Sequence, residues 1–166
     1  ALGVAEELGR LLLGLRRPPL QALARLHVLA AADLVTDSDA LGRPRPEPGT
    51  AERLDTLVRL VGGATTVAAP VLVAVVHGEL LAVAAFGTAD GVVARAAARL
   101  TALASGLDPK GLAVPEVGHL RRTGEYRAAA AAFASGTPDG LTRWLLHCCW
   151  AWQLGAREAE SIAAAA

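Results

Sequence analysis

The sequence predicts an all-α protein, a helical bundle built around one central, buried helix. The apolar run at residues 71–76, Val-Leu-Val-Ala-Val-Val, is compatible with a buried strand or a buried helix. Its apolar pattern continues without a break to residue 85, and this length favours the helix. A short turn and a second helix, opening at Ala89, Asp90 and Gly91, follow it. The 166 residues suffice for one domain with one core.

Prolines and glycines mark the predicted ends of the helices that precede this pair. We expect an amphipathic helix over residues 1–15, ended by Arg-Arg-Pro-Pro, and a second helix that runs to about residue 35 with prolines in its first turn. Residues 36–49 form a polar, proline-rich loop that should be exposed and flexible. Thr50 is the expected N-cap of a helix over residues 51–61. The predicted single domain thus has N-terminal helices (1–35), a loop (36–49) and a core (50–166).

Residues 60–78 carry no formal charge and are long enough to cross a membrane, but glycines, Pro70 and His77 interrupt the run. A buried core helix with Pro70 in its first turn explains the pattern better, so we expect no membrane association.

The C-terminal part begins with a long irregular connection over residues 106–118, and connections of this length are often functional. Helix is expected again over residues 119–134. Thr137, Pro138 and Asp139 then open a last helix, with the threonine hydroxyl as cap, proline at the first helical position and an acid at the positive end of the helix dipole.

The composition indicates the cellular environment of the protein and the kinds of partner that its charge favours. Sixteen basic and sixteen acidic residues give a formal net charge of zero, so bulk charge does not favour nucleic acid. The adjacent Cys148 and Cys149 cannot easily bridge within a helix, which indicates a reducing cytoplasm. The acidic N-terminal stretch is unlike a signal peptide, although the chain does not start with methionine and a leader ahead of Ala1 stays open. Arginine far outnumbers lysine, of which Lys110 is the only one, and this bias is typical of a GC-rich, for example actinobacterial, genome.

The turn ahead of Asp90 is a natural anion site, because free backbone N–H groups and the positive end of a helix dipole meet there. Residues 77–95 resemble the core of the Fic/Doc family, whose pattern is H-x-F-x-[DE]-G-N-G-R-x-x-R after a helix that often bears His and Glu. The matching residues are Phe86, Gly91 and Arg95, and HGEL ahead of the loop is similar to a divergent actinobacterial branch. The resemblance implies an all-helical bundle over residues 50–160. It also implies a loop that binds the phosphates of ATP with magnesium, for transfer of AMP to a protein hydroxyl.

The catalytic positions of that pattern are not kept. Ala84 stands where the family has its catalytic histidine, and a methyl group cannot accept a proton. The family's magnesium-binding acid, first glycine, asparagine and phosphate-binding arginine correspond here to Thr88, Ala89, Asp90 and Val92. By resemblance, the residues left to hold a nucleotide, weakly at most, are Ala89, Asp90, Gly91 and Arg95.

Several of these side chains allow two interpretations. His77 is either a substitute base or, as we favour, a hydrogen-bonded core histidine. Glu79 is expected to pair with an arginine or to cap a neighbouring loop rather than to bind metal. Arg95 and Arg99 share a helix face that reaches an anion or pairs with surface acids. No cluster of His, Cys, Asp and Glu has the spacing of a metal site.

Two functions therefore stand against each other. The preferred one is a cytoplasmic pseudoenzyme, a binding or regulatory module that engages a protein partner or forms a homodimer. The alternative is an active nucleotidyl transferase that uses another base. The joint loss of the base, the magnesium-binding acid and the phosphate-binding arginine disfavours it. Trp144, Cys148 and Trp152 form a predicted core stripe, whereas Trp150 projects elsewhere. Since 53% of the residues are hydrophobic, we expect apolar surface around Trp150 and in the 106–118 connection to meet a partner.

Overall fold

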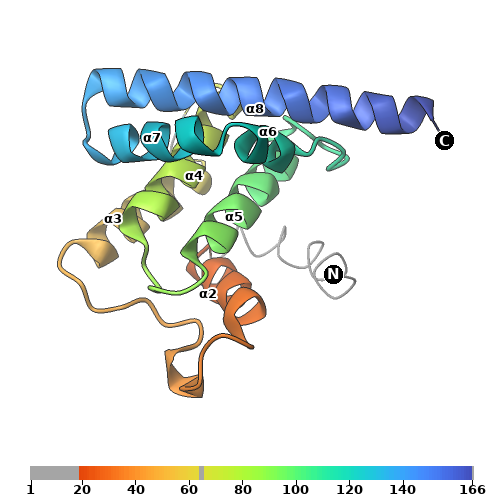
Figure 1. Cartoon of the computed structure of the whole chain (residues 1–166). Helices are drawn as coiled ribbons and strands as arrows, with labels where there is room; N and C mark the ends of the chain where they lie inside the picture. Colours follow the sequence, from red (N-terminus) through yellow and green to blue (C-terminus); the bar gives the residue numbers. More distant parts are fainter. Residues whose placement is uncertain (1–18, 64–65, 166) are drawn as a thin grey trace.

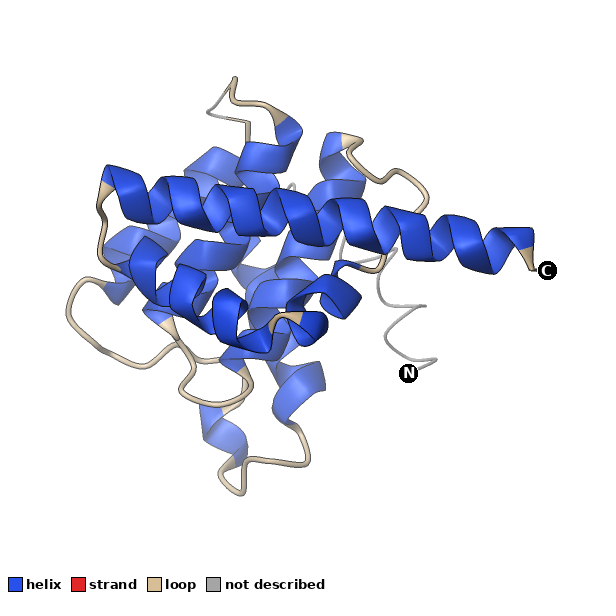
Figure 2. Cartoon of the chain, turned by 45° about the horizontal axis from the view of Figure 1, so that its top comes forward, coloured by secondary structure: helices blue, strands red, loops and turns tan. Residues whose placement is uncertain are grey.

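A computed structural model describes residues 19–63 and 66–165, which form seven α-helices, one short 3-10 helix and no strand. The prediction of an all-α fold is therefore confirmed. Figure 1 and Figure 2 show the helices stacked in crossing directions, with the longest one along one side of the bundle. The helix predicted over residues 1–15 lies outside the described residues.

The centre of the bundle is the hairpin of α4 (Ala69–Val83) and α5 (Asp90–Ser105), which pack on each other more extensively than any other pair. Pro70 stands in the first turn of α4, where its missing N–H costs nothing. Residues 71–76 are helical and largely buried, as predicted, so the helix interpretation of the apolar run is confirmed. Both helices are apolar over most of their surface because they are covered from two sides.

Helices α2 (Pro19–Ala31) and α3 (Thr50–Val61) cover one side of this hairpin. The leucines of α2 and α3 form the main core cluster with side chains of α4, α5 and the turn between them. The fully or nearly buried large members are Leu23, Leu26, Leu54, Leu57, Val76, Leu80, Phe86, Val93 and Leu100. In Figure 1, the turn between α4 and α5 reaches toward α2 at this end of the molecule.

The other side is covered by α6 (Pro115–Arg121), α7 (Thr123–Ala134) and the long α8 (Pro138–Ala164), whose C-terminal end extends past its neighbours (Figure 1). Trp144 of α8 is completely buried, and its indole Nε1 donates to the Ala74 carbonyl of α4 at 2.7 Å. Thr137 caps α8 as predicted, since its hydroxyl accepts the Gly140 N–H at 3.1 Å.

Several predicted boundaries are wrong. Helix α2 ends at Ala31 rather than near residue 35, and a turn over residues 32–34 follows, in which the N–H groups of Leu34 and Val35 both donate to the Ala31 carbonyl. Thr50 is not a cap: it is the buried first residue of α3, and Gly49, with a left-handed φ of 79°, precedes the helix.

The prediction for residues 106–134 also needs correction. The irregular connection is shorter than predicted, because Pro115 starts α6 with its fixed φ. The helical stretch expected over residues 119–134 begins earlier, at Pro115, and consists of two helices that meet at Arg122 with φ −124° and ψ 50°.

The proline-rich segment 36–49 is exposed, as predicted, and contains the 3-10 helix Ser38–Ala40. The sequence predicted a flexible loop, but hydrogen bonds hold this segment against the bundle. The Gly42 N–H donates to His27 Nδ1 at 2.9 Å, and the Arg45 N–H donates to the Ala85 carbonyl at 2.7 Å. None of the helices in the described part of the chain has the length and apolarity that a membrane crossing demands.

Candidate functional site

The turn between α4 and α5, residues 84–90, is the region of interest, and we call it the motif loop. Ala84 ends α4 with φ 45° and Ala89 precedes α5 with φ 55°, so two alanines adopt the left-handed backbone that favours glycine. Gly87 lies between them with φ 74°. The loop therefore reverses the chain in a few residues, and α5 opens at Asp90 as the sequence predicts.

The Asp90 carboxylate closes the motif loop on itself. Its Oδ1 accepts the backbone N–H of Phe86 at 2.9 Å, four residues earlier. The Phe86 ring is buried and stacks on His27 of α2, with ring centroids 4.3 Å apart and an interplanar angle of 8°. Asp90 thus fixes the loop from inside, and this is a structural role.

Arg45 fixes the same loop from outside. Its backbone N–H bonds the Ala85 carbonyl, and its guanidinium Nη2 donates to the Ala84 carbonyl at 3.0 Å. The guanidinium also lies against Gly87, where an added Cβ would stand 2.9 Å from Arg45 Nε. Sequence reasoning missed Arg45 because this contact joins residues 39 positions apart and no local pattern announces it.

Arg95, one turn into α5, points back along the helix. Its Nη1 lies 3.3 Å from where a Cβ on Gly91 would be, so the glycine leaves room for the guanidinium beside the first turn. Arg95 also hydrogen-bonds Tyr126 and acts electrostatically on His77 and His119. Among the four residues expected to hold a nucleotide, Arg95 supplies a cationic side chain near the start of α5. Gly91, which has no side chain, leaves space for the Arg95 guanidinium.

His77 is buried in α4, and its Nε2 lies 2.9 Å from the Tyr126 hydroxyl of α7. Burial first, and then the neighbouring His119, Arg95 and His147, lower the pKa of His77 well below its usual value. The favoured interpretation of His77 as a buried, hydrogen-bonded histidine is borne out by this geometry. It lies about two helical turns, on the order of 10 Å along the axis, from Ala84.

His77 belongs to a group that sequence reasoning did not find, which we call the histidine cluster: His77, His119, Tyr126, Trp144 and His147. His119 Nδ1 and His147 Nε2 are 3.1 Å apart, and the His119 ring centroid lies 4.5 Å from that of Tyr126. Burial, with the charges of His147 and Arg95, lowers the pKa of His119 to about 4. Burial likewise lowers the pKa of His147 and raises that of Tyr126. Four helices contribute to this cluster, so sequence spacing gives no signal for it.

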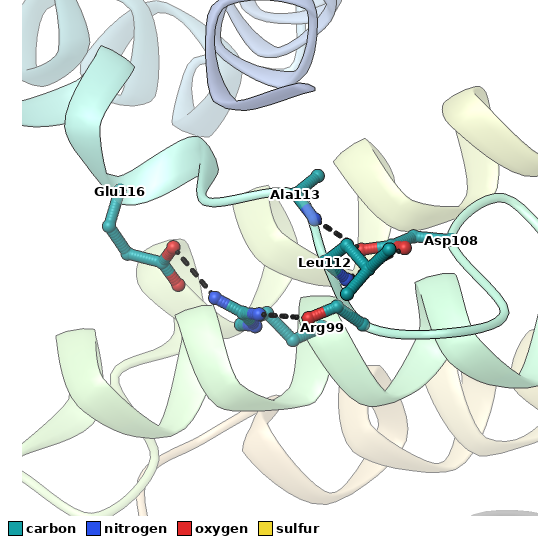
Figure 3. Close-up of polar contacts among 6 residues, drawn as sticks. Arg99, Asp108, Leu112, Ala113 and Glu116 are labelled. Carbon is teal, nitrogen blue, oxygen red and sulfur yellow. Dashed lines mark hydrogen bonds and ion pairs between the residues drawn. The ribbon is translucent and has the colours of Figure 1, made fainter. Parts of the chain in front are cut away.

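Arg99, predicted to share a face with Arg95, turns to the connection that follows α5. It donates to Glu116 Oε2 at 3.1 Å and to the Gly111 carbonyl at 3.2 Å. In the same connection the Asp108 carboxylate accepts two backbone N–H groups, those of Leu112 and Ala113, each at 3.0 Å (Figure 3). These contacts hold the 106–114 connection in place, and they commit Arg99 to an acid rather than to an external anion.

Glu79, Lys110 and the two cysteines are the remaining residues that the sequence analysis considered. Glu79 accepts from Arg53 Nε at 2.6 Å, which confirms the expected pairing with an arginine. Lys110 is exposed in its turn, and Cys148 and Cys149 are free thiols. Within residues 19–63 and 66–165, no three or more His, Cys, Asp or Glu side chains form a group that could hold a metal ion.

None of the protein-family models, curated proteins or solved structures with which this chain was compared matches it.

Proposed function

We propose that this chain is a catalytically inactive binding module with a Fic-like helical core, acting through a protein partner or a second copy of itself. The observation that carries the proposal is the state of the motif loop. At Ala84 it offers a methyl group where the Fic/Doc pattern has a base, and its own Asp90 and the covering Arg45 hold it closed. A loop tied in this way serves as a structural turn.

The chemistry near the loop supports a binding role over the transferase alternative. General-base catalysis needs a group within hydrogen-bond reach of the reacting proton. His77, the candidate substitute base, is 3% exposed and already pairs with Tyr126. Phosphoryl-type transfer also depends on neutralising charge, and the loop presents the Asp90 carboxylate in place of a neutral amide. A weak site for ATP with magnesium at Ala89, Asp90, Gly91 and Arg95 remains part of the proposal.

The surface supports a protein partner. Leu146 of α8 is 67% exposed, beside a groove of about 380 Å³ between α7 and α8. The groove is lined by Trp150, His147, Ala129, Arg143, Arg122 and Glu125. The Trp150 ring, expected to be uncovered, is half-buried under the Arg122 guanidinium, whose carbon lies 4.0 Å from the ring centroid. Tryptophan and arginine are enriched at the centres of protein interfaces, and the exposed leucine adds apolar surface beside them.

The decisive experiment incubates the protein with labelled ATP, magnesium and a mixture of acceptor proteins. We expect no transfer of AMP to the chain or to any acceptor. Labelling that disappears in a His77→Ala variant, and persists in a Glu79→Gln control, would overturn the proposal and make His77 the base.

Nucleotide binding is tested separately by the melting temperature. A ligand present at about one hundred times its dissociation constant adds about 2.7 kcal/mol to stability. We expect a small upward shift with millimolar ATP and magnesium that is lost in Arg95→Ala. An unchanged melting temperature in the parent chain would remove the nucleotide from the proposal and leave the protein partner.

A further inference from the structure

A second hollow lies beside the motif loop, on the face away from the histidine cluster. It has a volume of about 480 Å³, within the range of small-molecule sites, and its accessible surface is mostly apolar. Helix α2, the segment 42–47 and helix α3 enclose it. Its apolar lining from these segments includes Leu20, Leu23, Pro44, Pro46 and Leu54. Phe86 of the motif loop also lines it. The hollow is thus a concave pocket between segments rather than a flat helix face.

The charges of the lining define the chemistry of its occupant. The Arg45 guanidinium donates to the Ala84 carbonyl and packs on Gly87, so part of its hydrogen-bonding capacity is used by the motif loop. The other ionisable lining residue is Glu47, which would repel an anionic head group. Gln21 and Thr50 add uncharged polar groups to the lining. With one arginine and one glutamate, the lining has no net formal charge, so a charged ligand would lose its hydration here without a net countercharge.

We infer that this pocket binds an uncharged, predominantly apolar small molecule, and that the bound molecule stabilises the motif loop. The second part follows from the shared wall. Pro44 and Pro46 flank Arg45, whose backbone and side chain bond the carbonyls of Ala85 and Ala84. A ligand that contacts these prolines and the Phe86 ring favours the conformation in which Arg45 covers the loop. The inference goes beyond the proposed function, because it holds whether or not the motif loop binds a nucleotide.

The test uses the full chain with two ten-carbon probes, 1-decanol and decanoate, at pH 8. Backbone amide NMR should show saturable shifts with decanol at Gly42, Leu54 and Phe86 and none along α8. We expect decanoate to bind at least tenfold more weakly. The Phe86 and Gly87 amides should exchange with solvent several-fold more slowly when decanol is bound.

Two tryptophan variants locate the site. Ala51→Trp places a large ring from an exposed position of α3 into the pocket and should weaken decanol binding at least tenfold. Ala131→Trp adds the same ring at an exposed position of α7 outside the lining and should leave binding unchanged. Because shift mapping on the parent chain needs no variant, the inference stays testable even if Ala51→Trp unfolds.

Shifts that avoid the pocket, or no saturable binding, would overturn the assignment of the site. Equal or tighter binding of decanoate would overturn the uncharged ligand class. Unchanged exchange at Phe86 and Gly87 with decanol bound would overturn the coupling to the loop. None of these outcomes depends on the ATP experiment, so the two proposals fail independently.

Discussion

The Asp90 carboxylate helps to fix the form of the motif loop. Asp90 Oδ1 accepts the Phe86 N–H, and this bond holds the buried Phe86 ring against His27. Since the residue stands at the first position of α5, its charge is also favourable to the helix dipole. The same side chain that weakens an anion site therefore stabilises the fold.

This role predicts different effects for two substitutions. Asp90→Ala removes the acceptor and should lower the free energy of unfolding by about 1–2 kcal/mol, as loss of a capping side chain does. Asp90→Asn keeps an amide oxygen for the Phe86 N–H and should cost clearly less. Urea denaturation of both variants measures the difference, and equal losses would show that charge rather than the hydrogen bond matters.

The histidine cluster predicts a dependence of stability on pH. Folding lowers the pKa of His119 from its ordinary value of 6.5 to about 4, and it lowers that of His77 as well. An unfolded chain then binds more protons than the folded one between these values, so stability is fully present above pH 6.5 and is lost as the pH falls toward 4. His119 and His77 each contribute a slope of up to about 1.4 kcal/mol per pH unit within this window.

Denaturant midpoints at pH 7.5, 6, 5 and 4.5 check this prediction. His119→Phe retains a ring beside Tyr126 but cannot be protonated, so its curve should be flatter than that of the parent chain. A parent curve without any decline below pH 6.5, or an identical slope in the variant, would contradict the assignment.

At the scale of helices, glycine sets how closely α4 and α8 approach. A Cβ on Gly78 would lie 2.6 Å from Trp144 Nε1 and 3.0 Å from the Phe133 ring. The indole cannot move away without giving up its hydrogen bond to Ala74. Gly78 is thus required by packing, although glycine is a poor residue for a helix interior.

Two glycine-to-alanine changes separate packing from helix propensity. Gly78→Ala should destabilise the protein by about 1–3 kcal/mol, the usual cost of overpacking a core. Gly124→Ala, in the first turn of α7 where no atom lies within 4 Å of an added Cβ, should be neutral or stabilising by up to about 1 kcal/mol. Thermal unfolding followed by circular dichroism measures both, and a stabilising Gly78→Ala would refute the close packing of α4 against Trp144.

At the scale of the whole molecule, the exposed apolar side chains suggest where it associates. Leu146 and Leu120, 67% and 77% exposed, lie on the side covered by α6, α7 and α8, and Leu112 is exposed in the 106–114 connection. The sequence predicted partner contacts around Trp150 and in the 106–118 connection, but near Trp150 the exposed apolar side chain is Leu146, whereas Trp150 itself is half-buried.

The proposed binding role predicts that Leu146 matters for association. The parent chain should sediment as a dimer at micromolar concentration, or as a monomer that retains a defined protein under stringent washing. Leu146→Glu should weaken that association at least tenfold, whereas Leu34→Glu, at an equally exposed position after α2, should leave it intact. A monomer without a retained partner, or equal effects of both variants, would contradict the α7–α8 surface as the interface.

The sequence alone determined the helical class, the α4–loop–α5 hairpin, the proline in the first turn of α4 and the threonine cap of α8. These features depend on local signals, namely the length of an apolar run, a proline in a first turn and a threonine before a proline. The sequence also shows that position 84 offers no base, because the side chain of Ala84 is a methyl group.

Only the tertiary structure decided which distant side chains meet. Arg45 reaches the motif loop across 39 positions, and His77 meets Tyr126 across 49. The partition of residues 106–134 at Arg122 and the pocket walls likewise depend on helices packing from far apart in the chain. Hydrogen bonding and burial depend on distance in space, and a helical bundle sets those distances through packing that no local pattern encodes.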